Sequence, residues 1–280
     1  MAEGNAPAIS NPVEYIQHHL QNMSIGGKPE SLVDFSVFFV DIFVVTVILA
    51  GLFAFVSYKV GKNLDPDNPS GIQNVLEMVV EFVNQQVQDT FPNADKWIGP
   101  LAITIFVMVI LMNTMDLVPV DLLPSLVAGI ASIFGIDPHN VYLKVVPTTN
   151  LDTTFALAFL VFGLIIFYNI KHKGVVGYVK MYLFHPFGKY AIPANIPMTI
   201  IEELAKPISM GLRLFGNMFA GELLFLLIAL LGVGWAMPGQ VALGSIWAIF
   251  HIMVVTLQAY IFMLLTIIFL GIASQRGEDH

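Results

Sequence analysis

Five long apolar segments constrain the fold of this chain more than any other feature. They alternate with polar stretches and cover approximately residues 35–56, 98–118, 151–170, 194–232 and 241–272. About 20 consecutive apolar residues are enough for a helix to span the hydrocarbon core of a bilayer. Only 11% of the residues are charged, whereas a soluble domain has about 25%. The sequence therefore predicts an all-α polytopic membrane protein with five crossings, surrounded by the lipid bilayer.

The composition also excludes several classes of function. The chain has no cysteine, which rules out disulfides and thiolate metal sites. Its net charge is −8 and it has no basic tract, so we expect no nucleic-acid partner. The sequence contains no phosphate-binding glycine loop, no nucleophile–base arrangement and no metal-ligand spacing. We therefore expect a protein that is not an enzyme and that holds no cofactor or metal.

The segments between the apolar runs differ in character. Residues 1–34 form a polar tail, without the basic start of a signal peptide, and residues 35–280 form the membrane domain. Residues 72–91 have apolar positions at helical spacing opposite a polar face, which predicts an amphipathic helix at the membrane interface. Residues 119–150 contain four prolines and are expected to form a mixed loop, and residues 171–189 a basic loop.

The distribution of Lys and Arg predicts the orientation of the chain. Lys28 and Lys144 fall on one side of the predicted crossings, and most other cations fall on the opposite side: Lys59, Lys62, Lys96, Lys171, Lys173, Lys180, Lys189 and Arg276. Cytoplasmic loops are the ones enriched in Lys and Arg. The N-terminus is therefore expected to be periplasmic and the C-terminus cytoplasmic.

The last two apolar stretches are too long for a simple crossing. As helices, residues 194–232 and 241–272 would measure roughly 57 Å and 48 Å. The hydrocarbon core is only about 30 Å thick. We therefore expect these helices to be strongly tilted, to bend or to emerge from the membrane, and Pro197 and Pro207 make bending plausible.

The stretch from Glu202 to Glu222 carries polar side chains inside an apolar run. An Arg at the centre of a membrane helix costs roughly 2.5–3.5 kcal/mol, so intramembrane ions are usually functional. At 100° per residue, five polar side chains lie within roughly 80° of one another. This polar stripe consists of Glu202, Lys206, Ser209, Arg213 and Asn217. Glu222 lies near 200° from Glu202, so it faces a different surface.

Other polar residues fall in or near the predicted spans. His251 and Gln258 are seven residues apart and share one helix face, while Asp41, Asp116 and Asp121 lie near span ends. A carboxyl and an imidazole in a low-dielectric interior can exchange protons, which suggests a relay that includes Glu222 and His251. The alternatives are interhelical hydrogen bonds for the span residues and interfacial solvation for the three aspartates.

Four segments of this sequence resemble subunit a of bacterial F-type ATP synthases. The most specific are Lys206-Pro-Ile-Ser-Met-Gly-Leu-Arg-Leu-Phe-Gly-Asn-Met-Phe-Ala-Gly-Glu222 and Trp247-Ala-Ile-Phe-His-Ile-Met-Val-Val-Thr-Leu-Gln258. Glu14-Tyr-Ile-Gln-His-His-Leu20 and Leu111-Met-Asn-Thr-Met-Asp-Leu-Val-Pro-Val-Asp-Leu-Leu-Pro124 agree as well. The resemblance covers nearly the whole chain.

This resemblance implies a stator subunit in the bacterial inner membrane, lying against a ring of c subunits. The ring carboxylates would take up ions from one half-channel and release them into another, with peripheral-stalk b subunits and the rest of the F-type complex as further partners. By matching positions, Arg213 is the arginine that faces the ring. Asn217, Glu222, His251 and Gln258 match the periplasmic inlet, with Asp116, Asp121 and Asp41 as further candidates. Ser209 matches the cytoplasmic outlet, where the helical stripe also places Glu202.

Two other functions remain open at this point. A proton-coupled secondary transporter would share the intramembrane charges, but the sequence shows no internal repeat. An assembly or anchoring protein would leave Arg213 unexplained. The sequence also leaves open whether the ion is a proton or sodium, although Glu222 and His251 suit protons.

Overall fold

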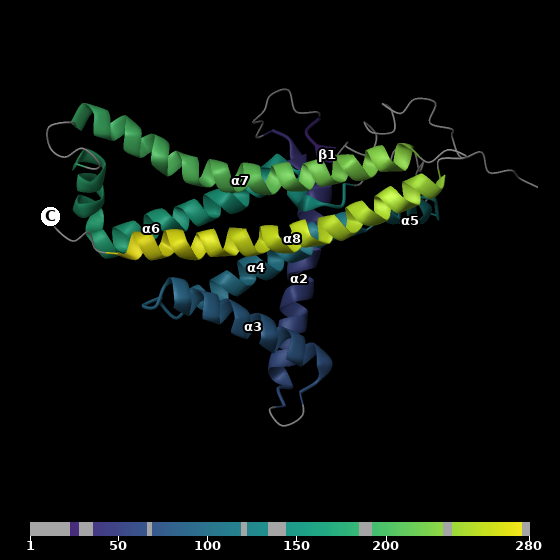
Figure 1. The fold of residues 1–280 in the computed structure, drawn as a ribbon, viewed down its shortest axis with the longest axis horizontal. Helices are drawn as coiled ribbons and strands as arrows, with labels where there is room; N and C mark the ends of the chain where they lie inside the picture. Colours follow the sequence, from purple (N-terminus) through teal and green to yellow (C-terminus); the bar gives the residue numbers. More distant parts are fainter. Residues whose placement is uncertain are drawn as a thin grey trace, which may run out of the picture. The chain divides into compact units, whose positions relative to one another are not determined.

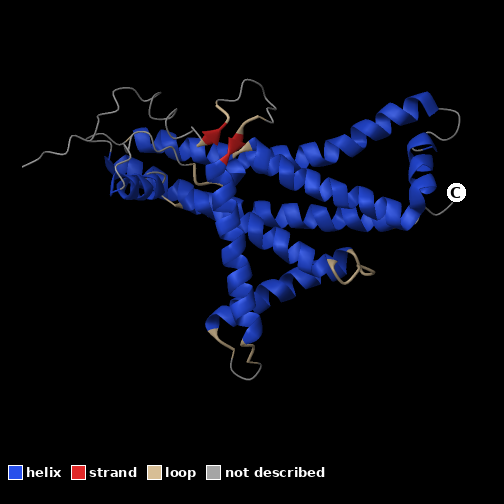
Figure 2. Ribbon diagram, turned by 180° about the vertical axis from the view of Figure 1, so that it is seen from behind, coloured by secondary structure: helices blue, strands red, loops and turns tan. Residues whose placement is uncertain are grey.

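A computed structural model describes residues 23–27, 36–65, 69–118, 122–133, 144–184, 192–231 and 237–275. These residues are predominantly helical, as Figure 2 shows, with two short strands. The chain divides into two compact units that are described separately. Unit 1 comprises Met1–Leu52, Leu111–Pro147 and Met218–Val255, and unit 2 comprises Phe53–Ile110, Thr148–Asn217 and Thr256–His280.

Within the described ranges, five segments are long and apolar enough to cross a membrane. They lie in helix α2 (Val40–Lys62), helix α4 (Ile98–Thr114) with the turn that follows it, helix α6 (Leu151–Phe184), helix α7 (Ile192–Leu230) and helix α8 (Met237–Ser274). This confirms the predicted all-α polytopic fold. Helices α7 and α8 contain 39 and 38 residues, so they are as long as the apolar stretches suggested. Many large apolar side chains are exposed, as expected of a surface that lipid covers.

Unit 1 begins with a small antiparallel pair of strands. Strand β1 (Ser24–Ile25) pairs with strand β2 (Phe38–Phe39), so helix α2 starts at Val40 and not at the start of the apolar run. Helix α5 (Leu122–Ile133) occupies part of the region where we expected a loop, so that expectation was wrong there. Pro124 lies in the first turn of α5, where a proline does not interrupt helical hydrogen bonds.

Unit 2 contains α3, α6 and parts of α2, α4, α7 and α8. It contains the amphipathic helix α3 (Gly71–Thr90), whose first turn is capped because the Ser70 hydroxyl accepts a hydrogen bond from the Gln73 N–H. Tyr168 of α6 and Phe262, Met263 and Ile267 of α8 are fully buried in its core. Figures 1 and 2 show the C-terminal part of α8 running alongside α6.

Helix α6 continues beyond the predicted end of the third span. It extends to Phe184 through a kink at Gly174, where the backbone adopts φ 71° and ψ 163°. This left-handed conformation favours glycine, which has no Cβ to clash with the backbone. Figure 1 shows the sharp change of direction. Residues 171–184 are therefore helical and not the predicted basic loop. The sequence favoured a loop there because glycine, present at position 174, is common in loops.

Candidate functional site

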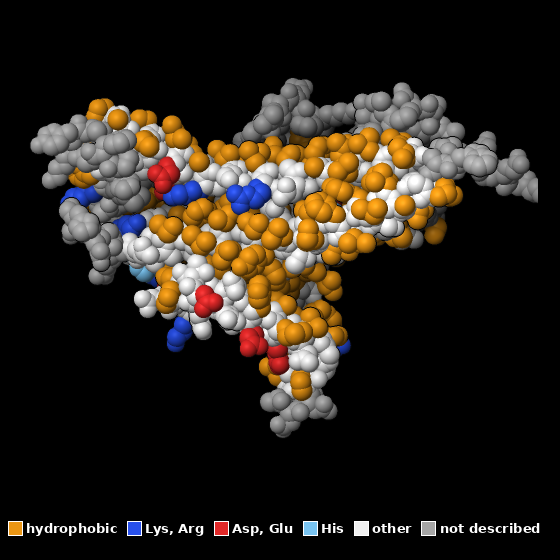
Figure 3. Space-filling model, viewed as in Figure 1, with side chains coloured by type: hydrophobic (Ala, Val, Ile, Leu, Met, Phe, Trp, Pro, Cys, Tyr) orange, Lys and Arg blue, Asp and Glu red, His pale blue; other side chains and the backbone are white. Residues whose placement is uncertain are grey.

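Polar side chains form a stripe along the N-terminal two thirds of α7. Glu202, Ser209, Arg213 and Asn217 share one helical face and are all exposed. They stand among exposed apolar side chains of the same helix, including Ile208 and Leu212. Figure 3 shows cationic side chains within a largely hydrophobic face. We call Glu202, Ser209, Arg213 and Asn217 the exposed stripe.

The contacts of the exposed stripe are sparse. One guanidinium nitrogen of Arg213, Nη2, lies 3.4 Å from the Ser209 hydroxyl, to which it donates a weak hydrogen bond. The Asn217 amide donates to Oε1 of Gln258 on α8 at 2.7 Å, and Gln258 itself is buried. A permanent cation on an outward-facing apolar surface therefore has room for a further, anionic partner.

Unit 1 contains a cluster of buried ionisable side chains from several elements. Nζ of Lys144 lies 3.5 Å from Oε2 of Glu222, and both side chains are 6% exposed. Nε2 of His251 lies 2.7 Å from Oδ2 of Asp116, with side-chain exposures of 1% and 2%. Together with Asp41 these residues form the buried charge cluster.

Asp41 holds the backbone that frames this cluster. Its carboxylate accepts hydrogen bonds from the backbone N–H groups of Met23, Ile42 and Lys144 at 3.0, 2.9 and 3.1 Å. Three such donors satisfy a buried carboxylate and fix its position. The geometry therefore favours a structural role for Asp41, which ties the segment before α6 to the start of α2.

Other polar atoms near the cluster in sequence are buried as well. Within the part of the chain that the structure describes, both side-chain polar atoms of Asn113 and Nε1 of Trp247 have no hydrogen-bond partner. An unsatisfied buried polar group costs about 1–3 kcal/mol, which a bound water molecule relieves. Asn113 on α4 lies three residues before Asp116, and the Trp247 ring lies 6.1 Å from the imidazole of His251.

Gly221 leaves the space that the imidazole of His251 occupies. A Cβ atom placed on Gly221 would lie only 2.2 Å from Cε1 of His251. The imidazole also stacks edge-on against Phe225, with ring centroids 5.4 Å apart. Helices α7 and α8 can therefore approach closely enough to bury His251 because residue 221 has no side chain.

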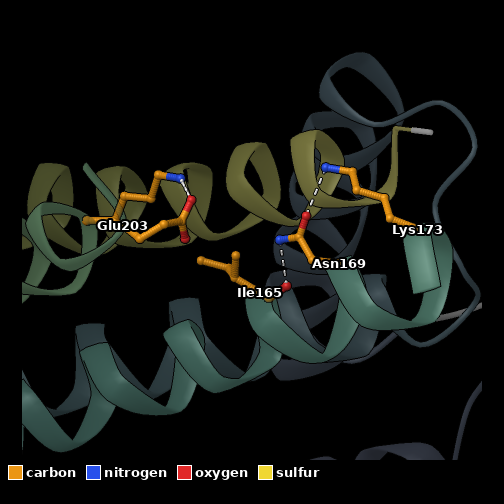
Figure 4. Close-up of polar contacts among 5 residues, drawn as sticks. Ile165, Asn169, Lys173 and Glu203 are labelled. Atoms are coloured by element: carbon orange, nitrogen blue, oxygen red, sulfur yellow. Dashed lines mark hydrogen bonds and ion pairs between the residues drawn. The ribbon is translucent and has the colours of Figure 1, made fainter. Parts of the chain in front are cut away.

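Unit 2 contains a polar pocket between α6, α7 and α8, with a volume of about 160 Å³. Its charged and polar lining consists of Asn169, Lys173, Thr199, Glu202, Glu203 and Lys206. Nζ of Lys206 lies 2.5 Å from Oε1 of Glu203, and the Lys173 ammonium donates to Oδ1 of Asn169 at 2.9 Å. Figure 4 shows these contacts, together with the hydrogen bond from Asn169 to the Ile165 carbonyl. Oε2 of Glu203 is buried without a hydrogen-bond partner in the described residues.

The structure rules out interfacial solvation for two of the aspartates, and it adds two residues to the candidate site. Asp41 and Asp116 are 3% and 4% exposed, so interfacial solvation does not apply to them, and Asp121 lies outside the described residues. The two added residues are Lys144 and Glu203, which the sequence did not predict as site residues. The signal for both was the rarity of charged residues in this chain. The partner of Lys144 comes from a distant segment, whereas the partner of Glu203 is Lys206, three residues along the same helix.

The described residues contain no group of three or more His, Cys, Asp or Glu side chains that could hold a metal ion. The candidate site consists of ion pairs and polar side chains on the long apolar helices and in the segments next to them. Such an arrangement defines a polytopic membrane protein that carries ionisable groups for ion movement.

Comparison with known proteins gives the family. The sequence profile described as "ATP synthase A chain" matches residues 39–271. The chain is 50% identical over 268 residues to ATP synthase subunit a of Idiomarina loihiensis, with 95% of this chain and 97% of the relative covered. It is 46% identical over 277 residues to the Marinomonas protein of that name (94% and 96% covered) and 44% identical over 297 residues to the one from Paracidovorax citrulli (100% and 99% covered). The chain belongs to the ATP synthase A chain family.

Family membership settles the broad class of function. The chain is a proton-translocating subunit of the F0 membrane sector and is not itself catalytic. It works in a complex with other F-type subunits, in a bacterial membrane. These assignments decide against the secondary-transporter and anchoring alternatives.

Proposed function

We propose that this chain is the stator that carries protons to and from a ring of c subunits through two half-channels, so that proton flow turns the ring and drives ATP synthesis. The observation that carries the proposal is Arg213, a permanent cation exposed on an apolar helix face. A guanidinium does not lose its proton in proteins. Arg213 therefore keeps each passing ring carboxylate ionised and blocks a direct proton leak between the half-channels.

The periplasmic inlet consists of the ionisable groups of the buried charge cluster and the amides that follow them. Asp116, His251 and Glu222 exchange protons, with Asp121 as a further candidate at the periplasmic end. Asp41 contributes by fixing the backbone that frames them. Asn217 and Gln258 stand nearer to Arg213 along α7 and α8 and form a hydrogen-bonded pair at 2.7 Å. Water beside Asn113 and Trp247 would extend the hydrogen bonding of the buried charge cluster within unit 1.

The cytoplasmic outlet consists of Ser209, Glu202 and the polar pocket of unit 2. Support comes from the mixture of carboxylates and ammonium groups around the pocket, and from the buried oxygen of Glu203. Lys206 links this pocket to the exposed stripe, since it lies within about 20° of Arg213 around the helix. A proton released from the ring thus meets a polar route along α7.

The remaining assignments concern orientation and partners. The excess of Lys and Arg at one set of loops supports a periplasmic N-terminus and a cytoplasmic C-terminus. The apolar surface around Arg213 supports contact with the c ring, and peripheral-stalk b subunits would hold the stator against rotation. Each charge that crosses 100 mV releases about 2.3 kcal/mol, so several protons are needed per nucleotide.

Replacement of Arg213 tests the proposal. In membrane vesicles with the complete synthase, Arg213→Ala should abolish ATP-driven proton pumping, because nothing then keeps the ring carboxylate ionised. The matched control is Lys62→Ala, which removes a cation at the end of α2 and should pump normally. Immunoblots should find subunit a in both membranes. Pumping at the normal rate by Arg213→Ala would refute the stator mechanism.

A further inference from the structure

Glu203 is a buried carboxylate whose two oxygen atoms have different surroundings. Its side chain is 7% exposed, and Oε1 lies 2.5 Å from Nζ of Lys206, one turn further along α7 (Figure 4). Oε2 is buried as well, and it has no hydrogen-bond partner among the described residues. Buried polar atoms in native structures are normally hydrogen-bonded, so Oε2 points to a further group that binds beside it.

The pocket between α6, α7 and α8 gives this oxygen room for water. Its volume of about 160 Å³ is several times the roughly 30 Å³ that one water molecule takes up in the liquid. Glu203 shares the lining with Lys173 and Thr199, and a polar cavity of this size holds water. Glu202 also lines the pocket and belongs to the exposed stripe. The pocket therefore reaches the helix face that carries Arg213.

The charged side chains of the pocket come from two helices. Lys173 on α6 and Lys206 on α7 supply two positive charges, and Glu202 and Glu203 on α7 supply two negative ones. Lys173 interacts electrostatically with Glu203, as the paired Lys206 does. Glu202 is exposed, so Glu203 is the carboxylate of this lining that can hold a proton inside the protein. The residues that α8 contributes to the lining are apolar: Phe269, Ile272 and Ala273.

Lys206 can stay in place when Glu203 becomes neutral. Its side chain is 22% exposed, whereas that of Glu203 is 7% exposed, so water still reaches the ammonium group. The ammonium also lies 5.9 Å from the centre of the Phe269 ring, the distance of a cation–π contact. Protonation of Glu203 therefore does not leave a fully buried ammonium without a partner, which would be strongly unfavourable.

We propose that Glu203 is the proton-binding residue of the cytoplasmic outlet and that Lys206 positions its carboxylate. This inference rests on the proposed function, in which the pocket of unit 2 belongs to that outlet. During ATP synthesis, the proton that leaves a ring carboxylate passes through water to Oε2 of Glu203 and from there to the cytoplasm. During ATP-driven pumping the order is reversed. A proton from cytoplasmic water binds Oε2 and then moves to the ionised ring carboxylate, which leaves Glu203 ionised again.

The pH dependence of pumping by Glu203→Gln tests the proposal. In inverted membrane vesicles with the complete synthase, the outer solution is the cytoplasmic one. An amide does not take up a proton from this solution, so the ring carboxylate must take it directly from water. We expect the rate relative to the unmodified protein to fall by about fivefold or more as the outer pH rises from about 6 to about 9. Glu203→Asp, which keeps a carboxylate, and Glu81→Gln, at an exposed position on α3, should follow the profile of the unmodified protein.

A second pair of variants separates proton binding from ion pairing. Lys206→Gln keeps the Glu203 carboxylate, so it should show the pH profile of the unmodified protein even if its rate is lower. Glu203→Gln combined with Lys206→Gln should still lose activity at high pH, as Glu203→Gln does. A residue that serves only as the partner of Lys206 would instead lower the rate of Glu203→Gln equally at every pH, and the double variant would then pump like Lys206→Gln. That result would overturn the proposal.

The same variants keep the test decisive if Glu203→Gln does not assemble. The double variant contains no unpaired ammonium at position 206, and its pH profile then carries the comparison with Lys206→Gln. Equal profiles for these two would overturn the proposal. Failure of the stator mechanism itself would appear separately, as normal pumping by Arg213→Ala. Loss of pumping in Arg213→Ala with an unchanged profile in Glu203→Gln would overturn the role of Glu203 alone.

Discussion

Unit 1 and unit 2 differ in how they surround the charged groups of the same two helices. In unit 1 the C-terminal part of α7 and the N-terminal part of α8 bury Glu222 and His251 among side chains from other segments. In unit 2 the N-terminal part of α7 leaves Glu202, Ser209 and Arg213 exposed, while Glu203 is buried. The buried charge cluster suits the storage and transfer of protons, whereas the exposed stripe suits contact with a partner that moves past it.

The largest effect is expected where the close packing of unit 1 is disturbed. Gly221→Ala places a Cβ 2.2 Å from Cε1 of the buried His251, so one of the two must shift. Overpacking costs about 1–3 kcal/mol, and the displaced imidazole would leave Asp116. We expect most ATP-driven pumping to be lost. Gly244→Ala is the control, because its Cβ would meet Ile228 at an ordinary 3.6 Å.

The next largest effect should come from the buried carboxylate of Asp116. Asp116→Asn keeps the size of the side chain but removes the charge that lies 2.7 Å from Nε2 of His251. If the pair exchanges protons, pumping should slow by about tenfold or more. Asp89→Asn, at an exposed position on α3, serves as the control. Equal rates for the two variants would remove Asp116 from the inlet.

A smaller difference should separate the two neighbouring glutamates of unit 2. Glu203→Gln breaks the ion pair with Lys206, whereas Glu202→Gln changes an exposed side chain. Because Lys206 is partly exposed, we expect Glu203→Gln to cost roughly 1–2 kcal/mol and Glu202→Gln less. Thermal inactivation of the solubilised complex measures the difference. A larger loss of thermal stability in Glu202→Gln than in Glu203→Gln would show that burial does not determine which glutamate contributes more.

The smallest effect concerns Asp95, outside the membrane spans in unit 2. Hydrogen bonds from Lys171 and then from Tyr168 lower the pKa of Asp95 from 3.8 to about 2. A lowered pKa means that the contribution to stability is complete above about pH 4 and is lost as the pH falls through about 2. Asp95→Asn should therefore lower thermal stability slightly at neutral pH, and the difference from the unmodified protein should shrink towards pH 2. A constant difference would contradict this assignment.

The sequence predicted the helices better than their ends. The apolar runs and the amphipathic pattern of residues 72–91 indicated the helices because each signal lies within one segment. Helix α5 and the extension of α6 were missed, because Pro124 and Gly174 are ordinarily loop signals. In both places the surrounding helix tolerates the residue, one in a first turn and one at a kink.

The sequence likewise predicted part of the candidate site and not the rest. That Arg213 shares a face with Ser209 and Asn217, and that Glu222 does not, follows from the 100° advance of a helix and needs no tertiary contact. The partners of the buried groups could not be predicted so directly. Lys144 and Glu222 are 78 residues apart in the sequence, and Asp116 and His251 are 135 residues apart.

The sequence by itself therefore determined the membrane-spanning class, the long last helices and the common helical face of Arg213, Ser209 and Asn217. These properties depend on local hydrophobicity and on helical periodicity. Only the tertiary structure decided that Asp41 and Asp116 are buried, that Lys144 stands beside Glu222 and that Glu203 lines a pocket. Burial and ion pairing depend on which distant segments meet, and that is set by the packing of whole helices.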